Sequence, residues 1–245
     1  MRLTVLGGVG AWPSAGGACS GYLLEHDGYR VLVDPGYAVL PKLLTRIGAT
    51  EVDAVLVTHG HPDHCADLNP LLRARTMADE PPPALPLYAP PGAVDRVLAL
   101  DNPRMTEGAY ALHAFDPGDD FEVGPFAVRT WSLPHFVPNA GLRMAAGGRV
   151  VAYTGDTGPA PELIDLARDV DVYLAEATHP ERVPAELAAY LSSAVQAGET
   201  AARAGVGQLL LTHLWPGTDP EVPLAAAARG YAGPVAVATE GLSLM

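Results

Sequence analysis

Cysteine is nearly absent from this chain, and its scarcity limits how the fold can be stabilised. The 245 residues include only Cys19 and Cys65, too few for the disulfide framework of a small secreted domain. An apolar fraction of 49% instead predicts a sizeable hydrophobic core. For Cys65 we expect a small buried thiol rather than a metal-binding or redox group.

Basic residues are also scarce. Lysine and arginine together number 15 against 28 acidic residues, which gives a formal net charge of −13, and Lys42 is the only lysine. Nonspecific binding to long nucleic acid needs a basic surface. We therefore expect a small-molecule partner and do not expect extended nucleic acid.

No stretch is apolar for long enough to cross a bilayer. The first residues, Met1 to Leu6, enter a strand-like run directly, without the apolar region and cleavage site of a signal peptide. We expect a cytoplasmic protein with no membrane partner. With no linker and no repeat period, we expect one domain over residues 1–245, and the sequence leaves a homodimer open.

A phosphate-binding loop is missing as well. Gly7-Gly8-Val9-Gly10 has neither the G-x-G-x-x-G spacing nor a following Gly-Lys-Ser/Thr. We interpret it as a tight turn that lines a cleft.

Hydrophobic periodicity predicts a chain that alternates between strands and helices. Helices are expected at residues 38–47, 67–77, 92–101, 160–168, 192–204 and 220–229. Strands are expected at residues 2–7, 20–26, 30–34, 53–57, 86–89, 111–115, 121–123, 126–133, 141–146, 149–154, 171–175, 207–212 and 234–238. Weak periodicity at 102–110 suggests a cover over the site. The pattern favours an α/β (α+β) fold in which two mixed sheets pack face to face, with helices outside and a site at their shared edge.

The most informative stretch is T-H-G-H-P-D-H-C-A-D, from Thr58 to Asp67, which contains His59, His61, Asp63 and His64. Imidazole and carboxylate groups are the usual ligands of borderline divalent metals. The preceding apolar run predicts a buried strand, so the loop leaves the carboxyl end of that strand, where open α/β sheets place their sites. A solvated histidine-rich turn is the alternative interpretation.

Three later residues fit the same site. His135, Asp156 and His213 each follow an apolar strand-like run, and a two-metal site needs about seven ligands, of which the first loop supplies four. The remaining histidines, His26, His113 and His179, lack this context. Asp34, before Pro35-Gly36, fits either a support for the metal site or plain turn chemistry.

Several motifs now stand in order along the chain: T-H-G-H-P-D-H, His135 followed by Gly141-Leu142-Arg143, Y-T-G-D-T at Tyr153–Thr157, E-A-T at Glu176–Thr178 and T-H at Thr212–His213. From about residue 2 to 240 the chain resembles the metallo-β-lactamase superfamily, in the branch of ribonuclease Z and related phosphodiesterases. The resemblance implies a four-layer αβ/βα sandwich.

The resemblance also implies roles for the candidate ligands. One metal would be bound by His59, His61 and His135, and a second by Asp63, His64 and His213. Asp156 would bridge both. It implies two divalent ions, with zinc favoured, although manganese or iron suits the same ligands.

Two departures from ribonuclease Z affect the substrate. Where that family has a histidine before E-A-T this chain has Ala175, and a second family histidine falls on Tyr190 or Leu191. In the family these histidines handle the proton of the phosphate or leaving group. There is also no long basic insertion to grip tRNA, so a small substrate suits this chain better than a folded RNA.

The leading hypothesis is therefore a dinuclear-metal hydrolase, a phosphodiesterase acting on a small, cyclic nucleotide-like phosphodiester or an RNA end through a metal-bridged hydroxide. Asp63 and Glu176 are the catalytic candidates, Asp63 as a proton acceptor and Glu176 as an orienting group. Candidate phosphate-binding residues are Arg73, Arg75, Arg104 and Arg143. The alternatives are a lactone or thioester hydrolase, a ribonuclease Z-type tRNA 3′-processing nuclease and a non-catalytic metal-binding scaffold.

Overall fold

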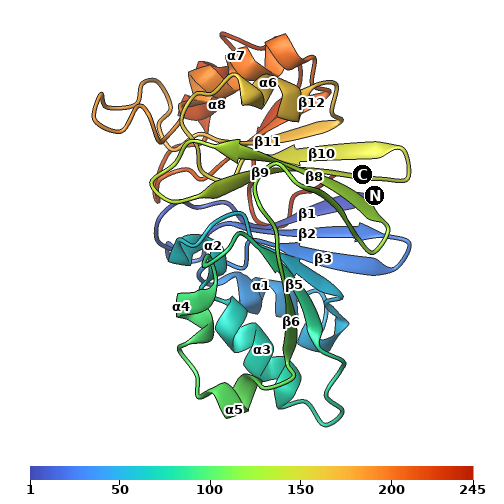
Figure 1. Ribbon diagram of the computed structural model, residues 1–245. Coiled ribbons are helices and arrows are strands. Elements are labelled where there is room, and N and C mark those ends of the chain that lie inside the picture. The colour runs from blue at the N-terminus through green and yellow to red at the C-terminus, as the bar shows by residue number, and fades with distance from the viewer. Residues whose placement is uncertain (245) are drawn as a thin grey trace.

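The computed structural model describes residues 1–244, and two mixed sheets form its centre (Figure 1). Helices α1 (Val39–Leu44) and α3 (Leu68–Thr76) lie outside one sheet. Helices α6 (Glu162–Ala167), α7 (Ala194–Ala204) and α8 (Glu221–Ala227) lie outside the other. The expected sandwich of two mixed sheets with helices outside is confirmed.

The first sheet has the strand order β14-β1-β2-β3-β4-β5-β6. Its strands are β1 (Arg2–Gly7), β2 (Gly21–His26), β3 (Tyr29–Val33), β4 (Ala54–Leu56), β5 (Leu85–Ala89), β6 (Tyr110–Ala114) and β14 (Ser243–Leu244). The β2–β3 hairpin turns at Asp27-Gly28, where both residues have positive φ (48° and 82°), as a two-residue hairpin of this twist requires. From β3 to β6 the strands are parallel. The short edge strand β14 was not predicted.

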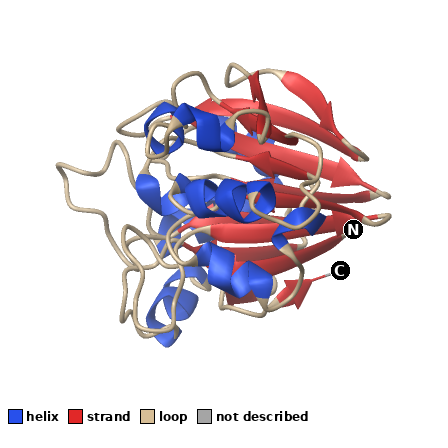
Figure 2. Ribbon diagram, turned by 90° about the horizontal axis from the view of Figure 1, so that it is seen from below, coloured by secondary structure: helices blue, strands red, loops and turns tan. Residues whose placement is uncertain are grey.

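The second sheet has the order β13-β12-β11-β10-β9-β8-β7. Its strands are β7 (Asp120–Val123), β8 (Phe126–Leu133), β9 (Asn139–Ala146), β10 (Arg149–Tyr153), β11 (Val172–Glu176), β12 (Gln208–Thr212) and β13 (Val235–Val237). Strands β7 to β10 are antiparallel neighbours, and β10 to β13 are parallel. Figure 2 shows the helices and the longer loops gathered toward one end of the strands.

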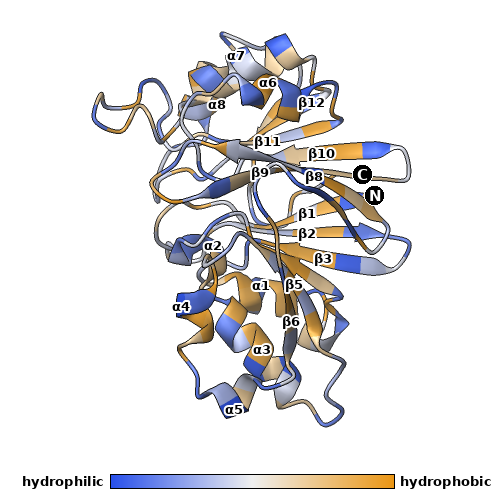
Figure 3. Cartoon of the chain, viewed as in Figure 1, coloured by the Kyte–Doolittle hydropathy of each residue, from blue (hydrophilic) through white to orange (hydrophobic). Residues whose placement is uncertain are grey.

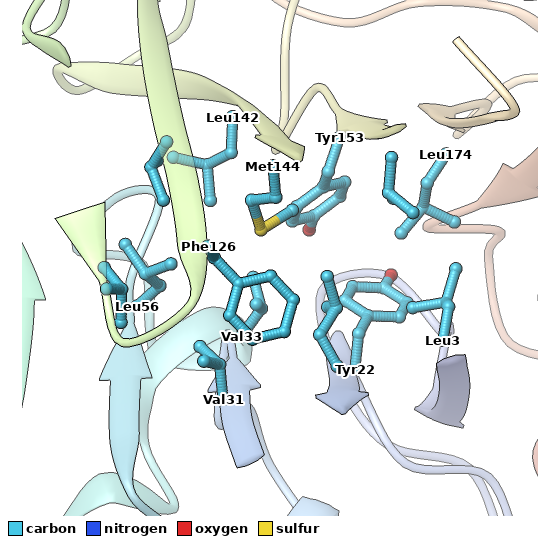
Figure 4. Close-up of a cluster of buried hydrophobic side chains, with 14 of the residues drawn as sticks. Leu3, Tyr22, Val31, Val33, Leu56, Phe126, Leu142, Met144, Tyr153 and Leu174 are labelled. Atoms are coloured by element: carbon cyan, nitrogen blue, oxygen red, sulfur yellow. The ribbon is translucent and has the colours of Figure 1, made fainter. Parts of the chain in front are cut away.

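The main core lies between the two sheets. From Phe126 to Thr130 on β8 buried and exposed positions alternate, because successive side chains of a strand point to opposite faces. In Figure 3 apolar colouring covers much of the strands and the helices α1 and α3, and hydrophilic residues mark the tips of the hairpins. In Figure 4 Tyr22 and Tyr153 face each other across this core, and their ring centroids lie 4.9 Å apart.

Helix α7 packs closely against the second sheet and α8 through small residues. Ser193 caps the start of α7 in a capping box with Gln196, and Gly205, with φ 70°, ends this helix. A side chain at Gly198 would clash with the carbonyl of Ala227 at the end of α8. Glycine at this position therefore permits the close approach of the two helices.

Four short helical segments, η1, α2, α4 and α5, differ from the sequence expectations. Helix α4 covers only Asp95–Leu98 of the expected 92–101, and α2 (Pro62–Cys65) and the 3₁₀ turn η1 (Ala49–Glu51) were not expected. The expectation that residues 102–110 cover the site is wrong. Helix α5 (Pro103–Thr106) lies at the bottom of Figure 1, beside α3.

None of the helices within residues 1–244 combines the length and the apolar composition that crossing a membrane requires.

Candidate metal centre

The metal-binding motif occupies the turn between β4 and α2. His61 is the residue before the first turn of α2, and Pro62 takes the first helical position, where its missing N–H costs no hydrogen bond. Asp63 and His64 follow on that turn, and His59 lies between the strand and the helix. The loop therefore brings its four polar side chains to the carboxyl end of a buried strand.

The three later candidates come from the opposite sheet. His135 follows β8, Asp156 follows β10, and His213 follows β12. His213 has a left-handed backbone, with φ 58°, a strained conformation that is concentrated at functional sites. A side chain at Gly10 would come within 2.8 Å of the His213 Nδ1 atom. The glycine turn expected to line a cleft thus packs directly against this histidine.

The structure brings all seven residues together in two groups that share Asp156. In each group the potential ligand atoms lie within 4.8 Å of one another. The groups are His59, His61, His135 and Asp156, and Asp63, His64, Asp156 and His213.

Distances within the groups suit tetrahedral coordination. The His61 Nδ1 atom lies 3.1 Å from His59 Nε2 and 3.0 Å from His135 Nε2. His213 Nε2 lies 3.1 Å from an oxygen of Asp63 and 3.1 Å from an oxygen of Asp156. Bonds of about 2.0–2.1 Å to a tetrahedral zinc ion place neighbouring ligands about 3.3–3.4 Å apart.

Two histidines on the first sheet's side of the centre, His64 and His59, are oriented by residues outside the ligand groups, which contact their Nδ1 atoms. The Nδ1 of His64 donates to Asp34 Oδ2 at 2.7 Å, and the Nδ1 of His59 lies 3.1 Å from Thr58 Oγ1. Because the Thr58 hydroxyl donates to Asp34, it is free to accept from His59. Both rings therefore present Nε2 to the centre.

On the second sheet's side of the centre, His135 and His213 are oriented in the same way through their Nδ1 atoms. His135 Nδ1 donates to the carbonyl of Tyr190 at 2.9 Å, and His213 Nδ1 lies 2.8 Å from Thr178 Oγ1. The Thr178 hydroxyl in turn donates to Glu176 at 2.7 Å. Glu176 therefore acts on His213 through Thr178, and its carboxylate also accepts hydrogen bonds from backbone amides. Burial and the nearby Asp156 raise the pKa of Glu176 to about 8.

Asp34, for which the sequence left two interpretations open, is a fully buried supporting residue. Its carboxylate accepts from the Thr58 amide at 2.8 Å, the Thr58 hydroxyl at 2.7 Å and the Tyr153 hydroxyl at 3.0 Å, in addition to His64. Its φ of 49° is the left-handed value that aspartate tolerates better than most residues. Asp34 therefore fixes the loop and the orientation of His64 together.

The electrostatics of the cluster favour a cation. Burial lowers the pKa of His59, His61 and His135, which keeps them neutral and able to bind metal. Burial acts to raise the pKa of Asp63 and Asp156, but the neighbouring histidines outweigh it and lower both values. The centre thus holds ionised carboxylates in a buried pocket.

Two buried polar atoms without hydrogen-bond partners in the described part of the chain also indicate a place for a cation. His64 Nε2 and Asp156 Oδ1 lie 3.2 Å apart, and neither has a hydrogen-bond partner among residues 1–244. An unpaired buried polar atom is costly. A cation between these ligands would satisfy both atoms, so the residues present fit a divalent metal pair.

The arginines expected to hold phosphate have other partners. Arg73 donates to Asp101 at 2.7 Å. Arg75 is buried and donates to the carbonyls of Ala49 and Val52. Neither guanidinium is directed at the metal centre, because each is held within the helical layer outside the first sheet.

Arg143 and Arg104 are also placed away from the centre. Arg143 donates to the carbonyls of Leu166 and Arg168 at the end of α6, on the outer face of the second sheet. Arg104 is exposed on α5. Three of the four arginines expected to bind substrate phosphate, Arg73, Arg75 and Arg143, therefore have other partners in the structure.

The two cysteines and the three remaining histidines lie outside the two ligand groups. Both cysteines are free and buried, which confirms the expected buried thiol at Cys65. His26, His113 and His179 belong to neither metal group.

A cavity of about 580 Å³ opens beside His61. Much of its lining is apolar and includes Tyr37, Leu100 and Val137, and Arg96 contributes the one guanidinium among the lining residues. Arg96 was not among the candidates expected from the sequence, because no periodicity or motif marks it.

Comparisons with known proteins agree with this geometry. A family model described as "Beta-lactamase superfamily domain" matches residues 29–214. The chain is 33% identical over 217 residues to the probable metallo-hydrolase YhfI of Bacillus subtilis, and the match covers 87% of each chain. The crystal structure of YhfI superimposes with a TM-score of 0.90 and 30% identity, over 99% of this chain and 98% of that one. A protein named ribonuclease Z from Mycolicibacterium gilvum is 31% identical over 256 residues, covering 90% of this chain and 86% of that protein.

Proposed function

Since this chain belongs to the β-lactamase superfamily of metallo-hydrolases, we propose that it hydrolyses a small phosphodiester of the cyclic nucleotide class or an RNA end. The observation that supports this most directly is the pair of ligand groups sharing Asp156. His59, His61 and His135 would hold one divalent ion and Asp63, His64 and His213 a second, and Asp156, which belongs to both groups, would serve both. Zinc suits the nitrogen-rich donor set best.

A pair of divalent cations supplies a water of lowered pKa and positive charge for the phosphoryl oxygens. The protein itself fixes the orientation of the imidazoles. Asp34, Thr58, Thr178 and the carbonyl of Tyr190 hold four imidazoles so that each presents its Nε2 atom to the centre. This preorganisation avoids rearrangement during the reaction.

Asp63 is placed to orient the attacking water. Its Oδ2 atom accepts from the Ala11 amide at 2.8 Å and lies 3.1 Å from His213 Nε2. We assign to its other oxygen the role of accepting a proton from that water. Glu176 does not reach the reacting space and is a positioning residue for His213, through Thr178.

The surroundings favour a small anionic substrate with an apolar portion. The cavity beside His61 has room for a small organic group, and Arg96 supplies positive charge at its wall. The chain's net charge of −13 opposes a long polyanion. A cyclic nucleotide fits these requirements better than a folded tRNA.

The decisive experiment is metal analysis and a substrate panel on one preparation. The panel contains an aryl phosphodiester, cyclic AMP, a precursor tRNA, a lactone and a thioester. We expect two equivalents of metal per chain and hydrolysis of the phosphodiesters. The His61→Ala variant serves as the matched control for contaminating activity. Hydrolysis of the lactone alone would overturn the assignment.

A lactone or thioester is the second candidate, and one observation favours it. The same cavity has much apolar lining and adjoins His61, which would suit an acyl chain. A cation pair polarises a carbonyl as well as a phosphoryl oxygen. The panel separates the two candidates because each substrate class is measured on the same metal-loaded protein.

A further inference from the structure

Every phenylalanine, tyrosine and tryptophan side chain that is exposed within residues 1–244 lies beside the candidate metal centre. These residues are Trp12, Tyr37, Phe136 and Tyr190. Trp12 is 50% exposed and Phe136 is 52% exposed, whereas the phenylalanine, tyrosine and tryptophan residues outside this set of four are half-buried or buried. Exposed aromatic surface is unfavourable in water, and its concentration at one place marks a binding surface.

Phe136 and Tyr190 form a pair on the His135 side. The Phe136 ring lies 5.1 Å from the His135 ring and 4.5 Å from the Tyr190 ring, centroid to centroid. The carbonyl of Tyr190 also accepts the His135 Nδ1 proton. Both aromatic residues are therefore fixed by the same imidazole that belongs to the first metal group.

Trp12 and Trp215 form a second pair on the side of the other metal group. Their ring centroids lie 4.9 Å apart, with 55° between the ring planes. Trp12 follows Ala11, whose amide donates to Asp63, and Trp215 lies two residues after His213. The two aromatic pairs thus border the two ligand groups separately.

We propose that Trp12, Trp215, Phe136 and Tyr190, the aromatic rim, bind a planar heteroaromatic ring of the substrate, of the nucleobase class. This inference rests on the proposed phosphodiesterase function. Aromatic faces stack on a base without reading its sequence-specific edges, and rigid rings offer large contact area at small entropic cost. The rim selects substrates by their base, while the metal centre binds their phosphate.

Tyr190 differs in residue type from what the family resemblance implies. The resemblance to ribonuclease Z implies a histidine at the position that falls on Tyr190 or Leu191 here. In this chain Leu191 is buried, and Tyr190 presents an exposed ring to Phe136. A stacking surface thus occupies the region where the resemblance would place an imidazole.

The chain provides its own optical probe. Its three tryptophans are Trp12, Trp131 and Trp215, and Trp131 lies on β8 beside Arg129. In a Trp131→Phe background all tryptophan fluorescence comes from the rim. We expect AMP to quench it, and calorimetry to show AMP binding about 5- to 100-fold more tightly than ribose 5-phosphate, which lacks the base.

Variants then separate stacking from structure. Phe136→Ala should weaken AMP binding by about 5- to 100-fold and leave ribose 5-phosphate binding unchanged, and Phe136→Trp should restore AMP affinity. Leu112→Ala, at a 45% exposed residue on β6, is the control and should change neither ligand's affinity.

Equal affinity for AMP and ribose 5-phosphate would overturn the aromatic rim, even if phosphodiesters are hydrolysed. Equal loss of both ligands in Phe136→Ala would also overturn it, since that result indicates a disturbed His135. Base-selective binding without hydrolysis of any phosphodiester would leave the rim in place and remove the proposed function instead.

Discussion

The hydroxyl of Tyr153, on β10 of the second sheet, donates at 3.0 Å to Asp34, which follows β3 of the first sheet. This hydrogen bond joins the apolar core to the metal centre, because the same carboxylate oxygen accepts from His64 at 2.7 Å. Tyr153 is fully buried and lies between the two sheets (Figure 4). The packing of the sheets and the orientation of a metal ligand therefore depend on one another.

Replacing Tyr153 by phenylalanine should destabilise the fold measurably. The change removes one hydrogen bond to a buried carboxylate, which is worth about 1.5–3 kcal/mol. Tyr231→Phe is the matched control, because Tyr231 donates to a neutral carbonyl, that of Val206, and should cost only about 0.5–1.5 kcal/mol. Urea unfolding of the metal-free proteins measures both. A smaller loss for Tyr153→Phe than for Tyr231→Phe would contradict this interpretation.

Asp34→Asn should weaken metal binding without unfolding the protein. The amide keeps the shape of the side chain but no longer holds the His64 Nδ1 proton with a charge. Loss of such an outer partner typically lowers metal affinity by about 10- to 100-fold. Competition with a chromophoric chelator measures the affinity. Asp171→Asn, which alters a carboxylate bound to the Val150 amide, is the control and should bind metal normally.

The number of bound metals should follow group membership. His61 belongs to one ligand group, so His61→Ala should retain about one metal ion per chain. Asp156 belongs to both groups, so Asp156→Ala should lose both ions. Asp63→Ala and His61→Ala should each lose most activity. Elemental analysis counts the ions, and full turnover by either variant without a stoichiometric metal pair would rule out the mechanism.

Arg96 and Arg73 should behave differently toward an anionic substrate. Arg96 lines the cavity beside His61, so Arg96→Ala should raise KM by about tenfold, the loss of one charge-assisted hydrogen bond. Arg73 forms an ion pair with Asp101 on the outer helical layer and is the control. Steady-state kinetics should show an unchanged KM for Arg73→Ala, and an equal rise in both variants would remove Arg96 from the binding site.

Both thiols should be unreactive in the folded protein. Burial raises the pKa of Cys19 and of Cys65 to about 12, so almost no thiolate forms near pH 8. An aromatic disulfide reagent should react with neither cysteine until urea is added, and absorbance follows the released thiolate. Rapid reaction of Cys65 in the native protein would show that the wall of the cavity beside His61 opens.

Local sequence patterns were reliable where one physical cause dominates. The Asp27-Gly28 turn could be predicted because a two-residue hairpin demands positive φ at both positions, and the buried strands could be predicted from their apolar runs. The bounds of α4 could not be predicted. Pro90-Pro91-Gly92 shifts the start of the helix, and no residue signals its length. Residues 102–110 have only weak hydrophobic periodicity. Their packing against α3 therefore had to be seen in the structure to show that they do not cover the centre.

By itself the sequence selected the seven residues that the structure brings together, since histidine and aspartate at the ends of apolar strands are recognisable from residue type and spacing. Only the tertiary structure decided how they are held and what surrounds them. Asp34, Thr178 and the carbonyl of Tyr190 orient imidazoles that lie far from them along the chain. Three of the four arginines chosen by residue type, Arg73, Arg75 and Arg143, donate to carbonyls or a carboxylate elsewhere. The physical reason is that a ligand's identity is local, whereas a hydrogen-bond partner or a cavity wall exists only when distant strands pack together.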